Sequence, residues 1–497
     1  MAESRVNSAE ILGSDLHLEL TRAGSRRTAL MSALREAVRG GRLVPGTRLP
    51  PYRSLAADLG IARNTVADAY AELVAEGWLT ARQGSGTRVA ARTAPPPPRH
   101  TGRERGGRPA PAAPTGRRRR AAPPPRPAHN LLQGQPDASA FPRTAWLASA
   151  RRALTAAPNE AFGPGDPHGR TELRRALADY LARARGVRTD PDRIVVCSGF
   201  AHALRLLSGT KVLRPALAVE SYGLAFHRSL LSAAGVRTVP LPLDDCGART
   251  EELTSHPGLR TVRAALLTPA HQFPTGGPLH PERRAAAVDW ARAGGGLVLE
   301  DDYDGEFRYD RQPVGAVQGL DPDRVLYLGS VSKSLSPALR LGWMVLPDHL
   351  VDVVLSVKGE REGWASALDQ LTLADFIASG GYDRHVRRMR LRYRRRRDAL
   401  VAALAERAPH IRVSGIAAGL HAVLELPPGT ERSAVQAASW QGLALDGLAG
   451  YRHPDATTPP LEGLVVGYAT PPEHAFPAAL DALCRALPPE HPTAGTR

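Results

Sequence analysis

Lys333 is the residue of this chain best suited to covalent chemistry. Lysine is rare here, since only Lys211, Lys333 and Lys358 stand among 65 basic residues. A primary amine can lose its proton and attack an aldehyde, whereas the guanidinium of arginine stays charged. Most lone lysines are solvated surface groups, but Lys333 lies in the segment GSVSKSLSPALRLG, residues 329–342, with hydroxyls and Arg340 around it. This segment predicts an anchor for an aldehyde that carries a phosphate.

Four short apolar runs lead into polar motifs in the second half of the chain. They cover residues 193–197, 264–268, 296–300 and 324–328, and helical segments separate them. Because the runs lack polar alternation, both faces of each should be buried, as in a mainly parallel sheet. Ligands of such sheets bind at the carboxyl ends of the strands, so we expect the polar motifs to meet there.

These motifs contain groups that suit a phosphorylated pyridine. Ser198, Gly199 and Phe200 follow the first run and open a helix whose N–H groups would hold a phosphate, although a generic strand-to-helix turn looks the same. Asp301 follows the third run, where a carboxylate is costly unless it pairs with a cation such as a protonated ring nitrogen. The phenol of Tyr303 could reach a ring oxygen. The last motif adds further phosphate ligands, Ser330, Ser332 and Arg340.

Residues 26–90 show the pattern of a small helical domain. Leu30, Leu34 and Val38 share one helix face, and helices are expected over residues 52–59 and 63–76. A short turn containing a glycine joins the last two helices, which matches a helix-turn-helix. Two short strands on either side of Gln83-Gly-Ser-Gly86 would then form a hairpin wing.

Polar residues stand where such a motif would contact DNA. Arg63, Asn64 and Thr65 open the last helix, whose N-terminal end enters the major groove in helix-turn-helix proteins. Arg53 would lie at the phosphate backbone, and the glycines of the wing would allow close approach to DNA. Periodicity alone also fits any three-helix bundle.

The segment between the two halves is basic and rich in proline. Residues 91–128 contain ten arginines and one acid, Glu104, which accounts for more than half of the net charge of +16. With few large apolar residues it cannot form a core, so we expect a disordered linker, either a solubilising spacer or a nonspecific phosphate tether. Three cysteines at unrelated spacings indicate free thiols in a reducing cytosol. No metal-ligand spacing stands out, and no apolar run approaches a membrane span.

Both halves resemble known families. The segments Gly46-Thr-Arg-Leu-Pro-Pro-Tyr-Arg-Ser-Leu-Ala, Asn64-Thr-Val-Ala-Asp-Ala-Tyr and Gly77-Trp-Leu resemble the GntR-type winged helix. Residues 130–480 resemble the fold-type I aminotransferases that depend on pyridoxal 5′-phosphate (PLP), with Gly134-Gln-Pro-Asp137 and Gly165-Asp-Pro-His-Gly169 as further matching segments. A winged helix joined by a long linker to such a domain resembles the MocR/PdxR subfamily of GntR regulators.

This resemblance implies the domain organisation and the fold. A mainly α winged helix-turn-helix would cover residues 14–90, and the linker residues 91–128. Residues 129–497 would form an α/β fold-type I aminotransferase-like domain, with a mainly parallel central sheet and a smaller C-terminal α+β subdomain.

The resemblance also assigns roles to the motif residues. Lys333 would form a Schiff base with PLP, Asp301 would pair with the ring nitrogen, and Tyr303 would bond the ring hydroxyl. Tyr222 would stack on the ring unless it belongs to the core. The phosphate would be held by Ser198, Gly199, Phe200, Ser330, Ser332 and Arg340. The positions that contact DNA in the GntR family correspond to Arg53, Arg63, Thr65 and Gly84.

Two positions depart from the aminotransferase pattern. Phe273 stands where these enzymes place an asparagine, and His271 or Gln272 would substitute for it at the cofactor. The late strand, residues 463–469, has no arginine to bind a substrate carboxylate, and Arg452 is near it only in sequence. Both departures favour sensing over efficient turnover.

The expected function is therefore a transcription regulator that binds double-stranded operator DNA and senses PLP or an amino compound that reacts with it. The resemblance further implies a homodimer, and the composition favours the cytoplasm, at the nucleoid. An active class I/II aminotransferase that carries a DNA-binding head is the main alternative. A nonspecific nucleic-acid binder that acts through the linker would leave the PLP motifs unexplained.

Overall fold

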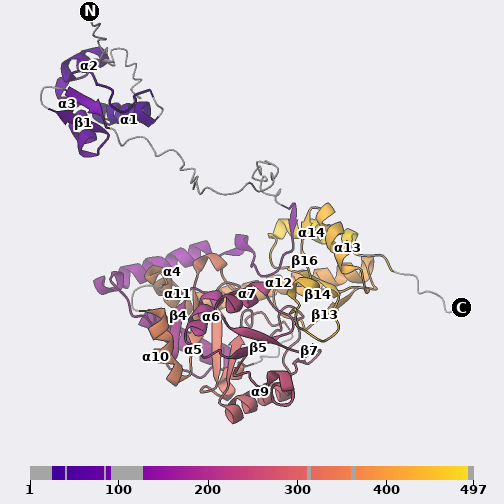
Figure 1. The fold of residues 1–497 in the computed structure, drawn as a ribbon. Helices are drawn as coiled ribbons and strands as arrows, with labels where there is room; N and C mark the ends of the chain where they lie inside the picture. Colours follow the sequence, from indigo (N-terminus) through magenta and orange to yellow (C-terminus); the bar gives the residue numbers. More distant parts are fainter. Residues whose placement is uncertain are drawn as a thin grey trace, which may run out of the picture. The chain divides into compact units, whose positions relative to one another are not determined.

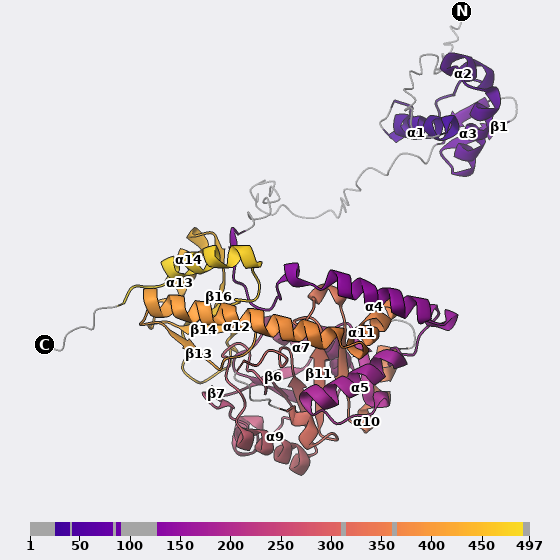
Figure 2. The same ribbon diagram turned by 180° about the vertical axis from the view of Figure 1, so that it is seen from behind.

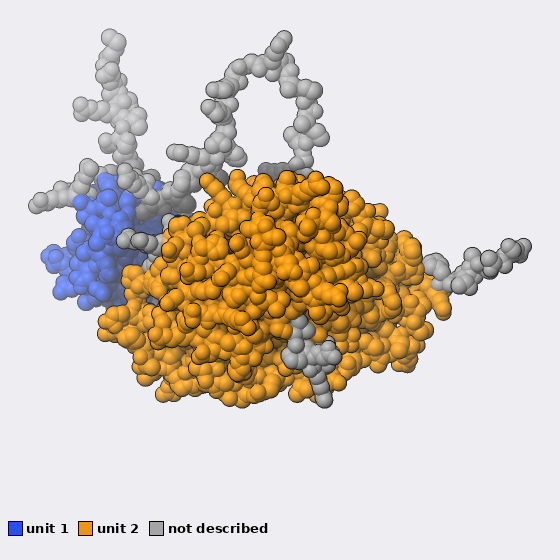
Figure 3. Space-filling view, turned by 90° about the horizontal axis from the view of Figure 1, so that it is seen from below, with its two compact units in different colours: residues 1–119 blue, residues 120–497 orange. Residues whose placement is uncertain are grey.

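The computed structural model describes residues 25–39, 42–82, 86–90, 127–309, 315–359 and 365–490. The chain divides into unit 1, residues 1–119, and unit 2, residues 120–497 (Figure 3). Most of the expected linker, residues 91–126, lies outside the described residues, as do Gly84 and residues 14–24. The domain boundaries near residues 90 and 128 therefore stay predictions.

Unit 1 is a three-helix domain with a β-hairpin (Figure 1). Its elements are α1 (Arg26–Arg39), α2 (Tyr52–Leu59), α3 (Arg63–Ala75), β1 (Leu79–Arg82) and β2 (Gly86–Val89). β1 and β2 pair antiparallel, and α2 ends at Gly60 in a left-handed conformation with φ of 62°. The helices pack around one core, which includes Leu30, Leu34, Leu55, Val66, Tyr70 and Leu73. This is the predicted winged helix-turn-helix.

Seven strands form the central sheet of unit 2, in the order β4-β12-β11-β10-β9-β5-β6. Their bounds are β4 (Ile194–Cys197), β5 (Ala216–Glu220), β6 (Arg237–Leu241), β9 (Ala264–Leu267), β10 (Leu297–Asp301), β11 (Val325–Ser330) and β12 (Gly342–Val345). Neighbours run parallel except β12, which is antiparallel to both β11 and β4. The prediction of a mainly parallel sheet is confirmed, and β4, β9, β10 and β11 coincide with the four apolar runs.

Helices cover both faces of this sheet, which explains why its strands are apolar throughout. Their bounds are α5 (Thr171–Arg185), α6 (Phe200–Gly209), α7 (Ala225–Ala233), α9 (Pro281–Gly294), α10 (Asp348–Lys358) and α11 (Ala367–Ala378). Val195 and Leu299 face α6, α7 and α10, whereas Val196 faces α5 and α11. Val298 faces α9 on the same side as Val196. Further elements are α4 (Arg143–Ala156), α8 (Glu252–Ser255), β3 (His129–Asn130), β7 (Leu243–Asp244), β8 (Gly247–Ala248) and β15 (Leu443–Ala444).

A smaller α+β subdomain lies at the C-terminal end. Its antiparallel sheet has the order β13-β14-β17-β16, formed by β13 (Arg412–Ser414), β14 (Ala422–Glu425), β17 (Gly463–Val466) and β16 (Asp446–Gly447). α13 (Glu431–Trp440) and α14 (Phe476–Ala486) complete it. The long helix α12 (Gly381–Arg407) links the two parts of unit 2 (Figure 2). Tyr382 joins the core of the large part, whereas Tyr393 and Leu404 join that of the small one.

No helix in the described ranges is both long enough and apolar enough to cross a membrane.

Candidate functional site

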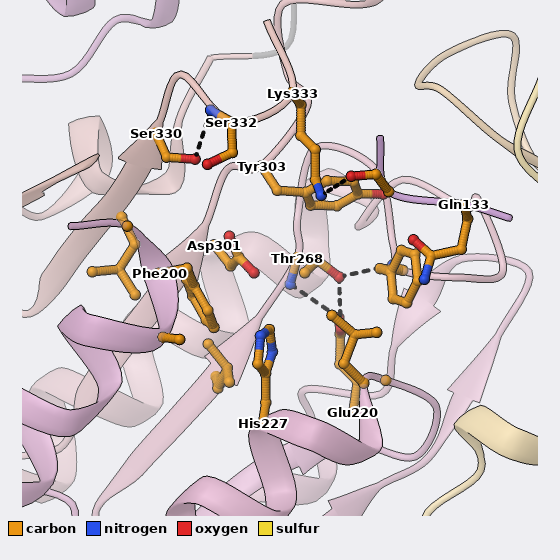
Figure 4. A pocket seen from close by; sticks show the side chains of 18 of the residues that line it. Gln133, Phe200, Glu220, His227, Thr268, Asp301, Tyr303, Ser330, Ser332 and Lys333 are labelled. Atoms are coloured by element: carbon orange, nitrogen blue, oxygen red, sulfur yellow. Dashed lines mark hydrogen bonds between the residues drawn. The ribbon is translucent and has the colours of Figure 1, made fainter. Parts of the chain in front are cut away.

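A cavity of about 270 Å³ opens at the carboxyl ends of the strands of the central sheet. Its walls come from the ends of β5, β10 and β11, the N-terminus of α6, the helix α7 and the loop before β14. Figure 4 shows these side chains around one space. Most of the predicted cofactor residues line it, namely Gly199, Phe200, Tyr222, Asp301, Tyr303, Ser330, Ser332, Lys333 and Arg340.

Lys333 lies in the cavity wall on the turn after β11. Its Nζ donates to the carbonyl oxygen of Gly134, and it has no ion-pair partner within the described residues. Burial lowers the pKa of Lys333, while the negative charges of Asp301 and Asp304 act in the opposite direction. A lowered pKa favours the neutral amine, which is the form that attacks an aldehyde.

Asp301 occupies the last position of β10. Across the described ranges its carboxyl group has neither a hydrogen-bond nor an ion-pair partner. Burial raises the pKa of Asp301 well above its ordinary value, and repulsion from Asp302 adds to the increase. Asp302, in contrast, already has partners. Its Oδ2 accepts from Arg185 Nε at 2.6 Å and from the Tyr327 hydroxyl at 2.7 Å. An unpaired, half-buried carboxyl in the cavity wall is the group that a protonated ring nitrogen would stabilise, so Asp301 fits that role and Asp302 does not.

Hydroxyl, guanidinium and backbone donors suited to a phosphate also line the cavity. Ser330 ends β11, and the N–H of Ser332 lies 3.4 Å from its Oγ. Arg340 has a left-handed backbone, with φ of 52°, and no hydrogen-bond partner among the described residues. It lies close to the start of α6, because a Cβ placed on Gly199 would come 3.8 Å from Arg340 Nη1. A dianionic phosphate between these donors and the helix N-terminus would be well stabilised.

Two predicted residues, Ser198 and His271, do not line the cavity. The hydroxyl of Ser198 lies 3.0 Å from Nδ1 of His202, one helical turn later, so this local contact occupies it. His271 is buried, with Nδ1 2.9 Å from Asp304 Oδ2 and 3.0 Å from the hydroxyl of Tyr303. His271 therefore contacts Tyr303, which lines the cavity, and not the cavity itself.

The predicted departure from the aminotransferase pattern at Phe273 lies in the cavity wall. Phe273 places an aromatic ring in the cavity wall, where aminotransferases were expected to have a polar amide. Gln272 does not substitute for it, because its amide donates to Glu220 and to the carbonyl oxygens of Tyr222 and Phe273. Tyr222 lines the cavity but is also core, since it is 2% exposed and its hydroxyl accepts from the N–H of Leu461.

Three titratable cavity residues were missed by sequence reasoning. Burial lowers the pKa of His227 to about 4 and that of His421 to about 3, so both rings are neutral near pH 7. Burial raises the pKa of Glu220 to about 7 at the end of β5. Its place at a strand end, two residues before Tyr222, was a usable signal. The histidines lie on a helix and a loop without any pattern that marks them.

Among the described residues, the cavity has no arginine for a substrate carboxylate besides the one assigned to the phosphate. Within the described residues, its only guanidinium groups belong to Arg228 and Arg340. The guanidinium of Arg228 donates to the carbonyl oxygens of Gly223, Tyr451 and Arg452 at 2.7–3.1 Å. The side chain of Arg452 donates to two other carbonyl oxygens and does not line the cavity.

The predicted DNA-contacting residues of unit 1 lie on its surface. Arg53 on α2 and Arg63 and Asn64 in the first turn of α3 are exposed, and Thr65 is half-buried. In the part of the chain that the structure describes, their side chains make no hydrogen bond or ion pair. They are therefore available for phosphates and base edges.

Comparison with known proteins gives matches over both units. The family model of bacterial regulatory proteins of the gntR family matches residues 27–89, and that of class I and II aminotransferases matches residues 128–445. The HTH-type pyridoxine biosynthesis transcriptional regulator PdxR of Corynebacterium glutamicum is 33% identical over 80% of this chain and 82% of its own length. The probable rhizopine catabolism regulatory protein MocR of Rhizobium meliloti is 34% identical over 88% of this chain and 89% of its own length.

Solved structures share the fold of unit 2. An archaeal alanine:glyoxylate aminotransferase matches with a TM-score of 0.66 and 22% identity, over 72% of this chain and 90% of that one. The kynurenine aminotransferase of Pyrococcus horikoshii matches with a TM-score of 0.65 and 24% identity over the same shares. At these identities the likeness shows the fold alone.

Proposed function

This chain belongs to the MocR/PdxR group of GntR-type transcription regulators, which join a DNA-binding winged helix to an aminotransferase-like domain, and we propose that it senses PLP or an amino compound that reacts with PLP. The observation that carries this proposal is the pair formed by Lys333 and Asp301. Both are half-buried, neither has an ion-pair partner among the described residues, and both line one cavity at the end of the sheet.

The residues present fit PLP. When bound, PLP supplies an aldehyde that reacts with primary amines. Lys333 would hold the aldehyde carbon, Asp301 would keep the ring nitrogen protonated, and Tyr303 would face the ring hydroxyl. The aromatic wall of Tyr222 and Phe273 would exclude water from the ring. The phosphate would lie among Gly199, Phe200, Ser330, Ser332 and Arg340.

Homodimerisation belongs to the same proposal. A homodimer would present two winged helices to an operator with two half-sites. We place the protein with the DNA, in the cytoplasm at the nucleoid.

Asp301→Asn should weaken PLP binding by about 10- to 100-fold. The substitution keeps the shape of the side chain but removes the anion, and a charge-assisted contact contributes about 1.5–3 kcal/mol. Equilibrium titration of the purified variant, followed by the absorbance of bound PLP, measures the effect. An unchanged affinity and spectrum would remove Asp301 from the site.

Tyr303→Phe and His271→Asn should shift the pH at which the spectrum of bound PLP changes, and in the same direction. Among the described residues, the hydrogen bond of His271 to a residue of the cavity wall is the one to the Tyr303 hydroxyl, and Asp304 contacts the same ring nitrogen. The double variant should therefore show the same pH shift as Tyr303→Phe alone. The reason is that the His271–Tyr303 hydrogen bond is already lost in Tyr303→Phe. Additive shifts would contradict this positioning role. His453→Asn is the matched control, since this buried histidine bonds Thr238 and does not line the cavity.

An active aminotransferase remains the second candidate, because the cavity holds the residues that PLP chemistry needs. Turnover with common amino acids and keto acids should nevertheless be slow, since Arg228 of the described cavity is bonded to carbonyl oxygens and Arg340 is assigned to the phosphate. Steady-state assays at saturating substrate decide between the two. A rate within the usual range of about 1–10³ per second would favour the enzyme.

A further inference from the structure

The buried face of helix α12 contacts the segment that carries Lys333. The hydroxyl of Tyr382 donates to Ser334 Oγ at 2.7 Å, and Nε2 of His385 lies 2.8 Å from the carbonyl oxygen of Ser334. Ser334 follows Lys333 directly in the chain. All three contacting residues are buried, so α12 packs directly against the lysine segment.

The opposite side of α12 is a row of exposed arginines, which we call the arginine face: Arg384, Arg387, Arg388, Arg394 and Arg395. At 100° per residue they fall within an arc of about 120°, and Leu391, 62% exposed, lies among them. Figure 2 shows α12 along the outside of unit 2.

Little negative charge balances the arginine face. Within the described residues, its one ion pair joins Arg394 to Asp398 at 3.8 Å. Arg387 and Arg395 make no hydrogen bond or ion pair in the described ranges. Like charges spaced three and four residues apart destabilise a helix, so this arrangement has an energetic cost that an anionic partner would remove.

We propose that the arginine face binds the phosphate backbone of double-stranded DNA. Its arginines span 12 residues of helix, from Arg384 to Arg395, a rise of about 16 Å that is enough for two or three successive phosphates of one strand. Guanidinium groups match phosphates in a bidentate geometry. The proposal rests on the DNA binding of the winged helix and not on the binding of PLP.

DNA is favoured over an acidic protein surface by the architecture of the chain. The winged helix of unit 1 holds DNA on the same polypeptide, so that the effective concentration of phosphates near unit 2 is high. An acidic protein would have to be recruited separately, and Leu391 is the only apolar anchor that the arginine face offers it. One helix would then contact DNA on one side and the lysine segment on the other, so the two equilibria would be coupled reciprocally.

The test compares the salt dependence of operator binding by the full-length protein and by a triple variant, Arg387→Gln, Arg394→Gln and Arg395→Gln. Removal of one arginine–phosphate interaction should lower the slope of log K against log salt by about 0.9, so that a decrease of about 2–3 is expected. The corresponding Arg→Lys variant keeps the charges and should retain most of the slope. Neither variant should change the spectrum of bound PLP.

The matched control is Arg205→Gln, Arg237→Gln and Arg260→Gln, which removes three exposed arginines elsewhere on unit 2. Its slope should stay at the wild-type value. Equal slopes for the two triple variants would overturn the proposal, because net charge alone would then explain the change. A triple variant that dissociates in sedimentation analysis would also overturn it, since the face would then be a subunit contact. The proposal would also be overturned if the triple variant kept the wild-type salt slope of operator binding and bound an acidic protein more weakly than the wild type.

Discussion

Replacing Lys333 with alanine should abolish the visible absorption band of bound PLP and leave the fold intact. The band requires a covalent bond between an amine and the aldehyde, and Lys333 is the only lysine that lines the described cavity. Its Nζ is bonded to one carbonyl oxygen and to no carboxylate, so its removal breaks no buried ion pair. Borohydride reduction of the wild-type protein, followed by peptide mass spectrometry, should find the cofactor on the peptide that contains Lys333.

Lys333→Arg should also lack the visible band of bound PLP, because a guanidinium stays protonated and cannot attack the aldehyde. Two other lysines serve as controls. Lys211 is exposed, and Lys358 is buried with its Nζ on the carbonyl oxygen of Val196 and with a pKa lowered by burial to about 8. Alanine at either position should leave the band unchanged. A band that survives in Lys333→Ala and disappears in Lys358→Ala would contradict the assignment.

A fragment of residues 1–90 should bind operator DNA about 10²–10⁴-fold more weakly than the full-length protein. The reason is bivalency, since a homodimer of unit 2 would deliver two winged helices to one operator. Electrophoretic mobility shift at one salt concentration compares the two proteins. Equal affinities would contradict the bivalent arrangement.

Arg63→Ala in the full-length protein distinguishes sequence recognition from general attraction to DNA. Arg63 is exposed in the first turn of α3, where a base contact contributes about 1–3 kcal/mol of discrimination. The variant should lose selectivity for the operator over random DNA and keep its PLP spectrum. The isolated fragment should show no response to PLP, because it lacks the cavity.

The sequence predicted the sheet well where burial leaves a strong pattern. Strands β9, β10 and β11 are covered by helices on both faces, so their apolar runs are uninterrupted and easy to identify. β12 was missed, because Gly342-Trp-Met-Val345 directly follows the lysine segment and reads as part of its turn. β5 was missed although all its residues are buried, and β6 was missed because Pro240 interrupts it at the edge of the sheet.

In the site, the sequence placed correctly at the cavity those residues whose backbone position follows from the sheet, while their roles toward PLP stay predictions. Asp301 and Ser330 end strands, and such positions follow from the sheet alone. Ser198 and His271 do not line the cavity, and each has a polar neighbour: His202 beside the Ser198 hydroxyl, and Tyr303 with Asp304 beside the His271 imidazole. The presence of His421 in the wall depends on how the smaller subdomain meets the large one, which no local pattern encodes.

The most direct test of the account is a titration of operator affinity with PLP at one fixed salt concentration. A ligand changes DNA binding only if it prefers one arrangement of the protein over another. Full-length wild-type protein and Lys333→Ala should bind the operator equally without PLP. Addition of PLP should change the affinity of the wild type and leave that of Lys333→Ala unchanged. An identical response of both proteins, or no response of the wild type to PLP or its amine adducts, would contradict the claim that the Lys333 cavity controls DNA binding.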